Sequence, residues 1–258
     1  MTPPPTPGPL APGSLSGTRA LVTGSSRGIG AQTVTYLAQA GASVVVNYRN
    51  KAARAEKLVA QLAEAGTTAI AVGADLTDDA SVAVMFERAR TELGGLDLLV
   101  LNASGGMEQG MAADYAMQLN RDAQVRVLRT ALPLMAPGSR VVFVTSHQAH
   151  FIETVETMPE YEAVARSKRA GEDALRALLP ELDAKGVEFV VVSGDMIEGT
   201  ITATLLERSN PGALATRKEA AGKLYDVAGF AAEVALAAVE PVPADRTRYV
   251  GDISSFTG

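Results

Sequence analysis

The sequence predicts a single α/β domain in which a parallel β-sheet lies between two layers of helices, a doubly wound, three-layer architecture. Three observations lead to it. The chain has 258 residues, a length that one α/β domain commonly reaches. Hydrophobic residues make up 47% of it and charged residues 20%, which is enough apolar side chain for a sizeable core. From residue 18 on, short apolar runs alternate with amphipathic segments of helix length.

Seven short apolar runs are the candidate strands. Most are rich in Val and Leu without a regular polar alternation, as expected for strands that are buried on both faces by covering helices. In order, and with the weakest pattern last, they are residues 19–23, 43–47, 69–72, 96–101, 140–145, 187–192 and 247–250.

Between these runs the apolar residues recur at helical spacing. The predicted helices are residues 29–40, 51–65, 79–93, 113–135, 164–184 and 225–239. The segment 195–223, after the sixth strand, is too long for an ordinary connection from strand to helix. Because doubly wound sheets bind ligands outside the carboxyl ends of their strands, this segment is expected to be a substrate lid.

The first 16 residues differ in composition from the rest. Six of the 13 prolines fall within the first 12 residues, which predicts a disordered tail over residues 1–16. This run lacks the positive flank and apolar centre of a signal peptide. No later stretch has the 18 apolar residues without a charge that a membrane span requires. We therefore expect a cytoplasmic protein with no membrane partner.

Charge and composition exclude several classes of function. The 23 basic and 29 acidic residues give a net charge of −6, which disfavours a nucleic-acid partner. The chain has no cysteine, so it can form neither a disulfide nor a thiolate site, and its two histidines offer little for a metal. The chemistry must come from oxygen and nitrogen groups or from a bound cofactor, and the expected partner is a small molecule.

A glycine-rich turn follows the first predicted strand and opens the first helix. Its sequence is Thr-Gly-Ser-Ser-Arg-Gly-Ile-Gly, beginning at Thr23. Glycines at such a turn let backbone N–H groups at the helix N-terminus approach the pyrophosphate of a dinucleotide. The candidate contacts in this loop are Gly24, Ser26, Arg27, Gly28, Ile29 and Gly30.

The end of the second strand indicates which dinucleotide would bind. A site for NAD places a carboxylate there, on the ribose 2′-hydroxyl, but this chain has Asn47, 17 positions after Gly30. Arg27 and Arg49 supply two guanidinium groups that could instead hold a 2′-phosphate, with Tyr48 between Asn47 and Arg49. The sequence thus favours NADP(H).

The Thr-Gly-x3-Gly-Ile-Gly pattern resembles the short-chain dehydrogenase/reductase family, and the resemblance extends over residues 19 to about 200. It implies a Rossmann-type fold and an oxidoreductase. Asp75-Leu76 matches a pair that contacts the adenine in the family. Asn102-Ala103 resembles part of the family's Asn-Asn-Ala-Gly motif, with either a structural or a cofactor-contacting role. Asn120 matches the helical asparagine whose carbonyl helps to hold a proton-relay water.

The resemblance also implies catalytic residues, with one departure from the usual pattern. Ser146 ends the fifth strand and matches the serine that hydrogen-bonds the substrate carbonyl. In the family's Tyr-x3-Lys motif, aligned on Lys168, the tyrosine position holds Val164. Tyr161 stands seven residues before Lys168 instead, and this Tyr-x6-Lys spacing resembles the enoyl-acyl-carrier-protein reductases of the same family.

Both spacings bring the two side chains to one face of a helix. Seven residues at 100° each return Tyr161 to within about 20° of Lys168, about 10.5 Å along the axis. In ketone reduction the hydride lands on the carbon bonded to the polarised oxygen, whereas in enoyl-thioester reduction it lands two carbons away. A tyrosine displaced from the nicotinamide favours the second reaction, and Ser146 favours the first.

In the implied mechanism Lys168 binds the nicotinamide ribose, and its charge helps the phenol of Tyr161 to donate a proton near neutral pH. Tyr161 and Ser146 would stabilise the developing oxyanion, and Asn120 would support the relay. His147 and His150 directly follow Ser146, so a histidine acid remains an alternative.

The histidines predict no metal site, and the resemblance adds two candidate contacts of the cofactor. A metal site built from the histidines and nearby glutamates is not expected, because no fixed spacing joins them. After the sixth strand, Ser193-Gly194 replaces the family's Pro-Gly, and Ile197 and Thr200 are candidate contacts of the nicotinamide carboxamide.

Taken together, the residues and the resemblance imply hydride transfer from NADPH to a ketone of 3-oxoacyl or polyketide type. Reduction of an enoyl thioester is the alternative reaction. An inactive dinucleotide-binding regulator is the alternative of another class, since Val164 replaces the usual tyrosine. The resemblance implies a homotetramer or homodimer built through the helices predicted at 113–135 and 164–184.

Overall fold

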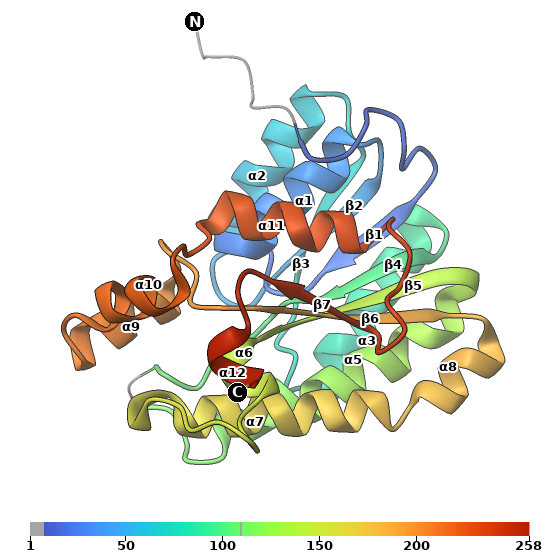
Figure 1. Ribbon diagram of the computed structural model, residues 1–258. Helices are drawn as coiled ribbons and strands as arrows, with labels where there is room; N and C mark the ends of the chain where they lie inside the picture. Colours follow the sequence, from blue (N-terminus) through green and yellow to red (C-terminus); the bar gives the residue numbers. More distant parts are fainter. Residues whose placement is uncertain (1–7, 109, 258) are drawn as a thin grey trace, which may run out of the picture.

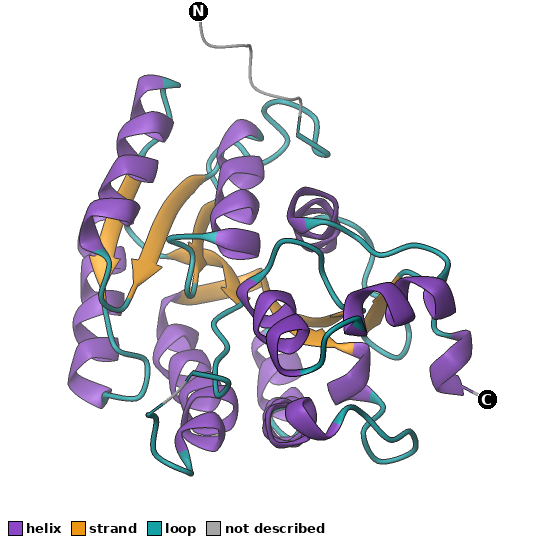
Figure 2. Ribbon diagram, turned by 90° about the vertical axis from the view of Figure 1, so that its left-hand side faces the viewer, coloured by secondary structure: helices purple, strands orange, loops and turns teal. Residues whose placement is uncertain are grey.

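The computed structural model describes residues 8–108 and 110–257 and contains one seven-stranded sheet with helices on both faces (Figures 1 and 2). The strand order is β3-β2-β1-β4-β5-β6-β7, and every neighbouring pair is parallel. This confirms the predicted Rossmann-type doubly wound fold. The strands are β1 (Arg19–Val22), β2 (Ser43–Tyr48), β3 (Ala69–Gly73), β4 (Leu96–Leu101), β5 (Met135–Ser146), β6 (Glu188–Gly194) and β7 (Thr247–Val250).

The helices form two layers, and each layer has its own core. In β2, Val44 and Val46 pack with α1 (Gly28–Gln39), whereas Val45 between them packs in the core on the opposite face. Both faces of the sheet are therefore buried, which explains the runs without polar alternation. The remaining helices of eight or more residues are α2 (Ala52–Glu64), α3 (Asp79–Leu93), α5 (Ala123–Ala131), α7 (Pro159–Arg176), α9 (Ile201–Ser209), α10 (Ala213–Ala221) and α11 (Val227–Ala237).

The helix predicted at 113–135 is broken in the structure. It consists of α4 (Tyr115–Met117), the π-helical turn η1 (Gln118–Asp122), α5 and the 3₁₀ turn η2 (Leu132–Leu134). Pro133 occurs within η2, where its missing N–H is tolerated. The helix predicted at 164–184 begins earlier, at Pro159, and is divided into α7 and α8 (Leu179–Lys185) near Pro180. A proline in the first turn of each helix accounts for both starts.

The N-terminal segment differs from the expectation of a disordered tail through residue 16. Leu10 and Leu15 are buried in the same core as α1, and the Leu15 N–H donates to the Ala40 carbonyl at 2.8 Å. Residues 1–7 of the predicted tail lie outside the described residues. Among the helices that the structure describes, none combines the length and the apolar content that crossing a bilayer requires.

The strand order reverses at β1, which lies between β2 and β4. Connections from the carboxyl ends of these two neighbours of β1 run in opposite directions, so a crevice opens outside the strand ends. The short helix α6 (His147–His150) follows β5 at this edge, and α9 and α10 lie to the left of the sheet in Figure 1. The short helix α12 (Ser254–Thr257) lies near them at the end of the chain.

Candidate active site

A cavity of about 640 Å³ occupies this crevice. All of the residues that the sequence predicted to bind the cofactor line it. They are Gly24, Ser26, Arg27, Gly28, Ile29, Gly30, Asn47, Tyr48, Arg49, Asp75, Leu76, Asn102, Ala103, Lys168, Ile197 and Thr200. Ser146 and Tyr161 line it as well. The fold therefore gathers side chains from most of the chain length into one site.

The glycine loop is shaped for close approach to a ligand. Gly24 and Gly28 have φ values of +62° and +57°, a region that other residues rarely adopt. A Cβ on Gly30 would lie 2.6 Å from the Asn102 side chain, so only glycine lets α1 pack here. The N-cap of α1, Arg27, makes no capping bond with its side chain, unlike the N-caps of α3, α9 and α11. The first amides of α1 are therefore free of a side-chain cap at the cavity wall.

Two asparagines at the strand ends hold the loop in place. The Asn47 Oδ1 accepts from the Gly24 N–H at 2.9 Å. The Asn102 Nδ2 donates to the Thr23 carbonyl at 2.9 Å, and the Asn102 N–H donates to the Thr23 hydroxyl at the same distance. Both asparagine side chains are thus hydrogen-bonded to the backbone of the loop, which favours a role in shaping it.

Basic residues collect at one end of the cavity. Arg27 and Arg49 are joined there by Lys51 and Arg54 from the start of α2, which the sequence analysis did not select. All four are exposed. The Arg49 guanidinium hydrogen-bonds the Tyr115 hydroxyl and lies over its ring. This end of the cavity is suited to an anion, and the helical spacing of Lys51 and Arg54 is the signal that could have identified them.

Asp75 and Leu76 follow β3 at the same end. Burial raises the pKa of Asp75, but hydrogen bonds from the Thr77 hydroxyl and N–H outweigh it, and the net pKa lies below the ordinary value. Asp75 Oδ1 accepts both bonds, at 2.7 and 2.9 Å. The carboxylate is therefore ionised and fixed at neutral pH.

Ser146 and Tyr161 meet at the opposite end of the cavity. Their side-chain oxygens are 3.2 Å apart, and both residues are buried. Ser146 is the N-cap of α6, and its oxygen accepts from the Ala149 N–H at 3.3 Å. Because that bond uses a lone pair, the hydroxyl hydrogen of Ser146 remains available for donation. Two hydroxyls this close can both donate to a single oxygen atom.

Lys168 lies on the same helix as Tyr161. Helix α7 is continuous from Pro159, so Tyr161 and Lys168 lie on one face of the same helix. Both side chains line the cavity. Lys168 is only 9% exposed, and its ammonium makes no hydrogen bond or ion pair with any residue in the described ranges. A buried cation needs a polar partner, and the open side here is the cavity. Val164 is also buried, in the apolar cluster that contains Tyr161.

Ile197 and Thr200 line the cavity, whereas Asn120 lies behind its wall. Asn120 does not line the cavity formed by the described residues; its Nδ2 donates to the Ser167 hydroxyl at 2.9 Å and to the Gly105 carbonyl at 2.8 Å. The Thr200 hydroxyl donates to the Ile197 carbonyl at 2.8 Å and caps α9. Asn120 therefore supports α7 from outside the cavity, and Thr200 shapes the start of the lid segment.

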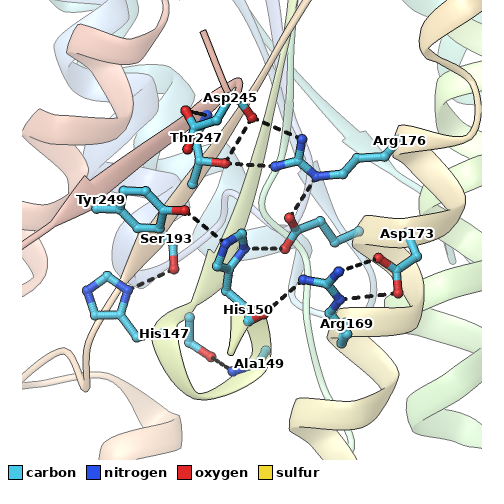
Figure 3. A network of polar contacts seen from close by, with 12 residues as sticks. His147, Ala149, His150, Arg169, Asp173, Arg176, Ser193, Asp245, Thr247 and Tyr249 are labelled. Atoms are coloured by element: carbon cyan, nitrogen blue, oxygen red, sulfur yellow. Dashed lines mark hydrogen bonds and ion pairs between the residues drawn. The ribbon is translucent and has the colours of Figure 1, made fainter. Parts of the chain in front are cut away.

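The two histidines face away from the cavity, into a polar network with β6 and β7 (Figure 3). The His147 Nε2 donates to the Val250 carbonyl at 3.1 Å, so its Nδ1 accepts from the Ser193 hydroxyl at 2.8 Å. His150 bonds the buried Glu172 at 2.9 Å and the Tyr249 hydroxyl at 3.1 Å. Neither ring reaches the cavity wall, so the geometry disfavours a histidine acid. Within residues 8–108 and 110–257, no three His, Cys, Asp or Glu side chains are grouped as metal ligands.

The buried ring of His147 predicts a pH dependence of stability. Burial lowers its pKa to about 4, whereas the unfolded chain protonates near pH 6.5. The native state is thus penalised as pH falls from about 6.5 towards 4. Between pH 7 and pH 5 we expect the free energy of unfolding to drop by about 2 kcal/mol more in the wild type than in His147→Gln. Urea unfolding at both pH values measures this difference, and equal drops in the two proteins would contradict it.

Several cavity residues were not found from the sequence. Gln148 lies two residues after Ser146, Asp195 follows β6, and Met158 precedes α7. Residues Ile201, Thr202, Ala203 and Leu206 of α9 also line the wall, and they belong to the segment 195–223 that the sequence predicted as a substrate lid. For Gln148 and Asp195 the available signal was their position just beyond predicted strand ends.

A family model described as short chain dehydrogenase matches residues 18–210. The chain belongs to this family. It is 35% identical over 201 residues to the short chain dehydrogenase/reductase nsrJ of Aspergillus novofumigatus, covering 75% of this chain and 73% of that protein.

Solved structures of the family have the same fold as this oxidoreductase. A short chain dehydrogenase from Burkholderia cenocepacia in complex with NADP is 28% identical, with a TM-score of 0.78, over 92% of this chain and 98% of that one. The angucycline C-6 ketoreductase LanV with bound NADP is 27% identical, with a TM-score of 0.73, over 90% and 92%.

Proposed function

We propose that this short-chain dehydrogenase reduces the carbonyl group of a small molecule with NADPH. The observation that carries the proposal is the pair of buried hydroxyls of Ser146 and Tyr161, 3.2 Å apart in the cavity that also contains the glycine loop. Such a pair suits one oxygen atom on which negative charge develops. A ketoreductase with bound NADP among the similar structures supports the same reaction.

The cavity fits a dinucleotide phosphate. The uncapped N-terminus of α1 at Gly28 would hold the pyrophosphate, and the cluster of Arg27, Arg49, Lys51 and Arg54 would hold a 2′-phosphate. Lys168, buried without a partner among the described residues, would bond the nicotinamide ribose. When bound, NADPH supplies the hydride.

In the proposed mechanism the chain positions the carbonyl and supplies the proton. Ser146 and Tyr161 donate hydrogen bonds to the carbonyl oxygen, and Tyr161 gives up its proton as that oxygen becomes an alcohol. The positive charge of Lys168 favours this proton loss. Asn120, bonded to Ser167 beside Lys168, supports the helix that carries both residues. In this proposal Tyr161, in a Tyr-x6-Lys motif, replaces the tyrosine usually found at the Val164 position.

Reduction of an enoyl thioester is the second candidate reaction, because Tyr161 lies two helical turns before Lys168. A panel of ketones and enoyl thioesters, mixed with NADPH and followed by nicotinamide absorbance, separates the two. We expect turnover of ketones. Turnover of enoyl thioesters alone would establish the second reaction. Tight NADPH binding with no turnover of any compound would instead indicate a dinucleotide-binding regulator.

Arg49 is predicted to contribute to the preference for NADPH over NADH. We expect Arg49→Ala to lower kcat/KM with NADPH about 10- to 100-fold, as for the loss of one charge-assisted contact, with little change for NADH. Arg88→Ala removes an exposed arginine of α3 outside the cavity and serves as the control. If the wild type has the same kcat/KM with NADH as with NADPH, and Arg49→Ala changes neither value, the assigned role of Arg49 is wrong.

The proposal also includes a substrate lid and an oligomeric assembly. We propose that α9 and α10, within the segment 195–223, act as the substrate lid, since residues of α9 already line the cavity. We also propose a cytoplasmic homotetramer or homodimer assembled through α5 and α7. Sedimentation equilibrium measures the assembly state.

A further inference from the structure

We propose that Gln148 is a specificity-determining residue, which accepts a hydrogen bond from a hydroxyl group on the substrate. The cavity would then select apolar ring ketones that also carry a hydroxyl donor away from the reacting carbonyl. This inference rests on the proposed function, because it concerns the substrate of that same site.

Gln148 is placed for direct contact with a substrate. It lies in α6, two residues after Ser146, and lines the cavity although it is only 8% exposed. Helix α6 begins at the Ser146 N-cap bond, so the position of Gln148 relative to the Ser146 hydroxyl is set by one helical turn. A group that Gln148 contacts is therefore part of the molecule whose carbonyl reaches Ser146 and Tyr161.

The orientation of the Gln148 amide is determined by its partner. Its Nε2 donates to Asp195 Oδ1 at 3.0 Å. An ionised carboxylate can only accept, so the amide cannot be reversed without losing this bond. No described residue donates a hydrogen bond to the Gln148 Oε1. This oxygen is also not completely buried by the described residues. We therefore take this oxygen as the acceptor that Gln148 presents to the cavity, and a substrate donor would satisfy it.

Asp195 is itself held by two other donor groups. Its carboxylate accepts from the Met196 N–H at 2.7 Å and from Arg217 Nε at 2.8 Å to each oxygen. Arg217 belongs to α10; its guanidinium lies 4.5 Å from the Phe256 ring centroid, and its Nη2 donates to the Ser255 hydroxyl at 2.9 Å. The Arg217–Asp195 ion pair is largely buried. Asp195 and Arg217 are therefore positioning residues for Gln148, and the same pair ties α10 to the end of β6.

The surrounding wall indicates the rest of the substrate. Met158, Met196, Ile201 and Leu206 line the cavity with apolar side chains. Methionine side chains adapt to flat or irregular apolar groups and contact aromatic rings favourably. An apolar ring compound with one hydroxyl donor would match both this wall and the single acceptor of Gln148.

Pairs of bicyclic aryl ketones provide the test. The probes are the hydroxytetralones whose hydroxyl cannot reach their own carbonyl, each compared with its methyl ether, which has no donor. With NADPH we expect the wild type to reduce the best hydroxyl compound at least about 10-fold more efficiently, by kcat/KM, than its ether. In Gln148→Met, which keeps the length but removes the acceptor, we expect this ratio to approach one.

The positioning role of Asp195 is tested by the same ratio of kcat/KM between each hydroxyl compound and its ether. Asp195→Asn can donate as well as accept, so the Gln148 amide is no longer held in one orientation, and the ratio is expected to fall. Arg90→Met is the control, because it removes an exposed ion pair with Glu87 within α3, away from the cavity. It should leave the ratio unchanged, and circular dichroism checks that each variant is folded.

The outcomes separate this inference from the proposed function. If ketones are reduced but no hydroxyl compound is preferred, or if Gln148→Met keeps the preference, the role of Gln148 is wrong while carbonyl reduction stands. If no ketone is reduced, carbonyl reduction is wrong. Calorimetric titration of the same pairs into the protein with NADPH then still measures whether the hydroxyl compound binds more tightly and whether Gln148→Met removes the difference.

Discussion

Replacement of Tyr161 by phenylalanine is expected to lower kcat for ketone reduction about 100- to 10,000-fold, the range over which a positioned proton donor acts. The side chain keeps its volume in the buried cluster around Val164, so the fold should be retained. NADPH binding should change little, because the ring lies beside Ser146, away from the basic residues proposed to hold the 2′-phosphate. Stopped-flow absorbance of the nicotinamide and calorimetric titration measure the two quantities.

Tyr225→Phe provides the control for the Tyr161 variant. It removes a phenol outside the cavity whose hydroxyl makes no hydrogen bond with the described residues. Its turnover should match the wild type. If Tyr161→Phe retains turnover within about 5-fold of the wild type, another group donates the proton and the Tyr-x6-Lys assignment is wrong.

Gly171→Ala is expected to destabilise the protein by about 3 kcal/mol, because no room exists for a methyl group. A Cβ on Gly171 would lie 2.0 Å from the Asn120 carbonyl oxygen. Helix α7 and the turn η1 pack backbone to backbone at this point, and neither can shift without moving Lys168 or Asn120. Urea unfolding measures the loss, and a fall in Tm of roughly 6–12 °C should accompany it.

Gly229→Ala serves as the control for Gly171→Ala. Gly229 is also helical, in α11, but a Cβ there would meet side-chain atoms of Asp226 and Tyr225 at 3.2 Å. The Tyr225 ring can adjust, and the Asp226 oxygen, which caps α11 through the Gly229 N–H, needs to move only slightly, so we expect a loss of no more than about 1 kcal/mol. Equal stability of the two variants would show that the contact between α7 and η1 yields easily.

Local patterns were sufficient to predict many of the residues that line one end of the cavity. The glycine loop, Arg27 and Arg49 are close in sequence to the first two strands, and the geometry of a parallel sheet brings those strand ends together. The sequence missed Lys51 and Arg54 because exposed cations on a helix are usually solvated. It also predicted one helix over 113–135, since apolar periodicity does not distinguish α from π or 3₁₀ turns.

The sequence by itself determined the sheet, its covering helices and the candidate residues Ser146, Tyr161 and Lys168, because strand burial and motif spacing are local properties. Only the tertiary structure decided which groups meet. The Tyr161 phenol lies against Ser146, the histidines turn towards β7, and Gln148 is held by Asp195 and Arg217. These contacts join residues 15 to 103 positions apart, so they depend on the packing of whole elements and leave no pattern in the chain.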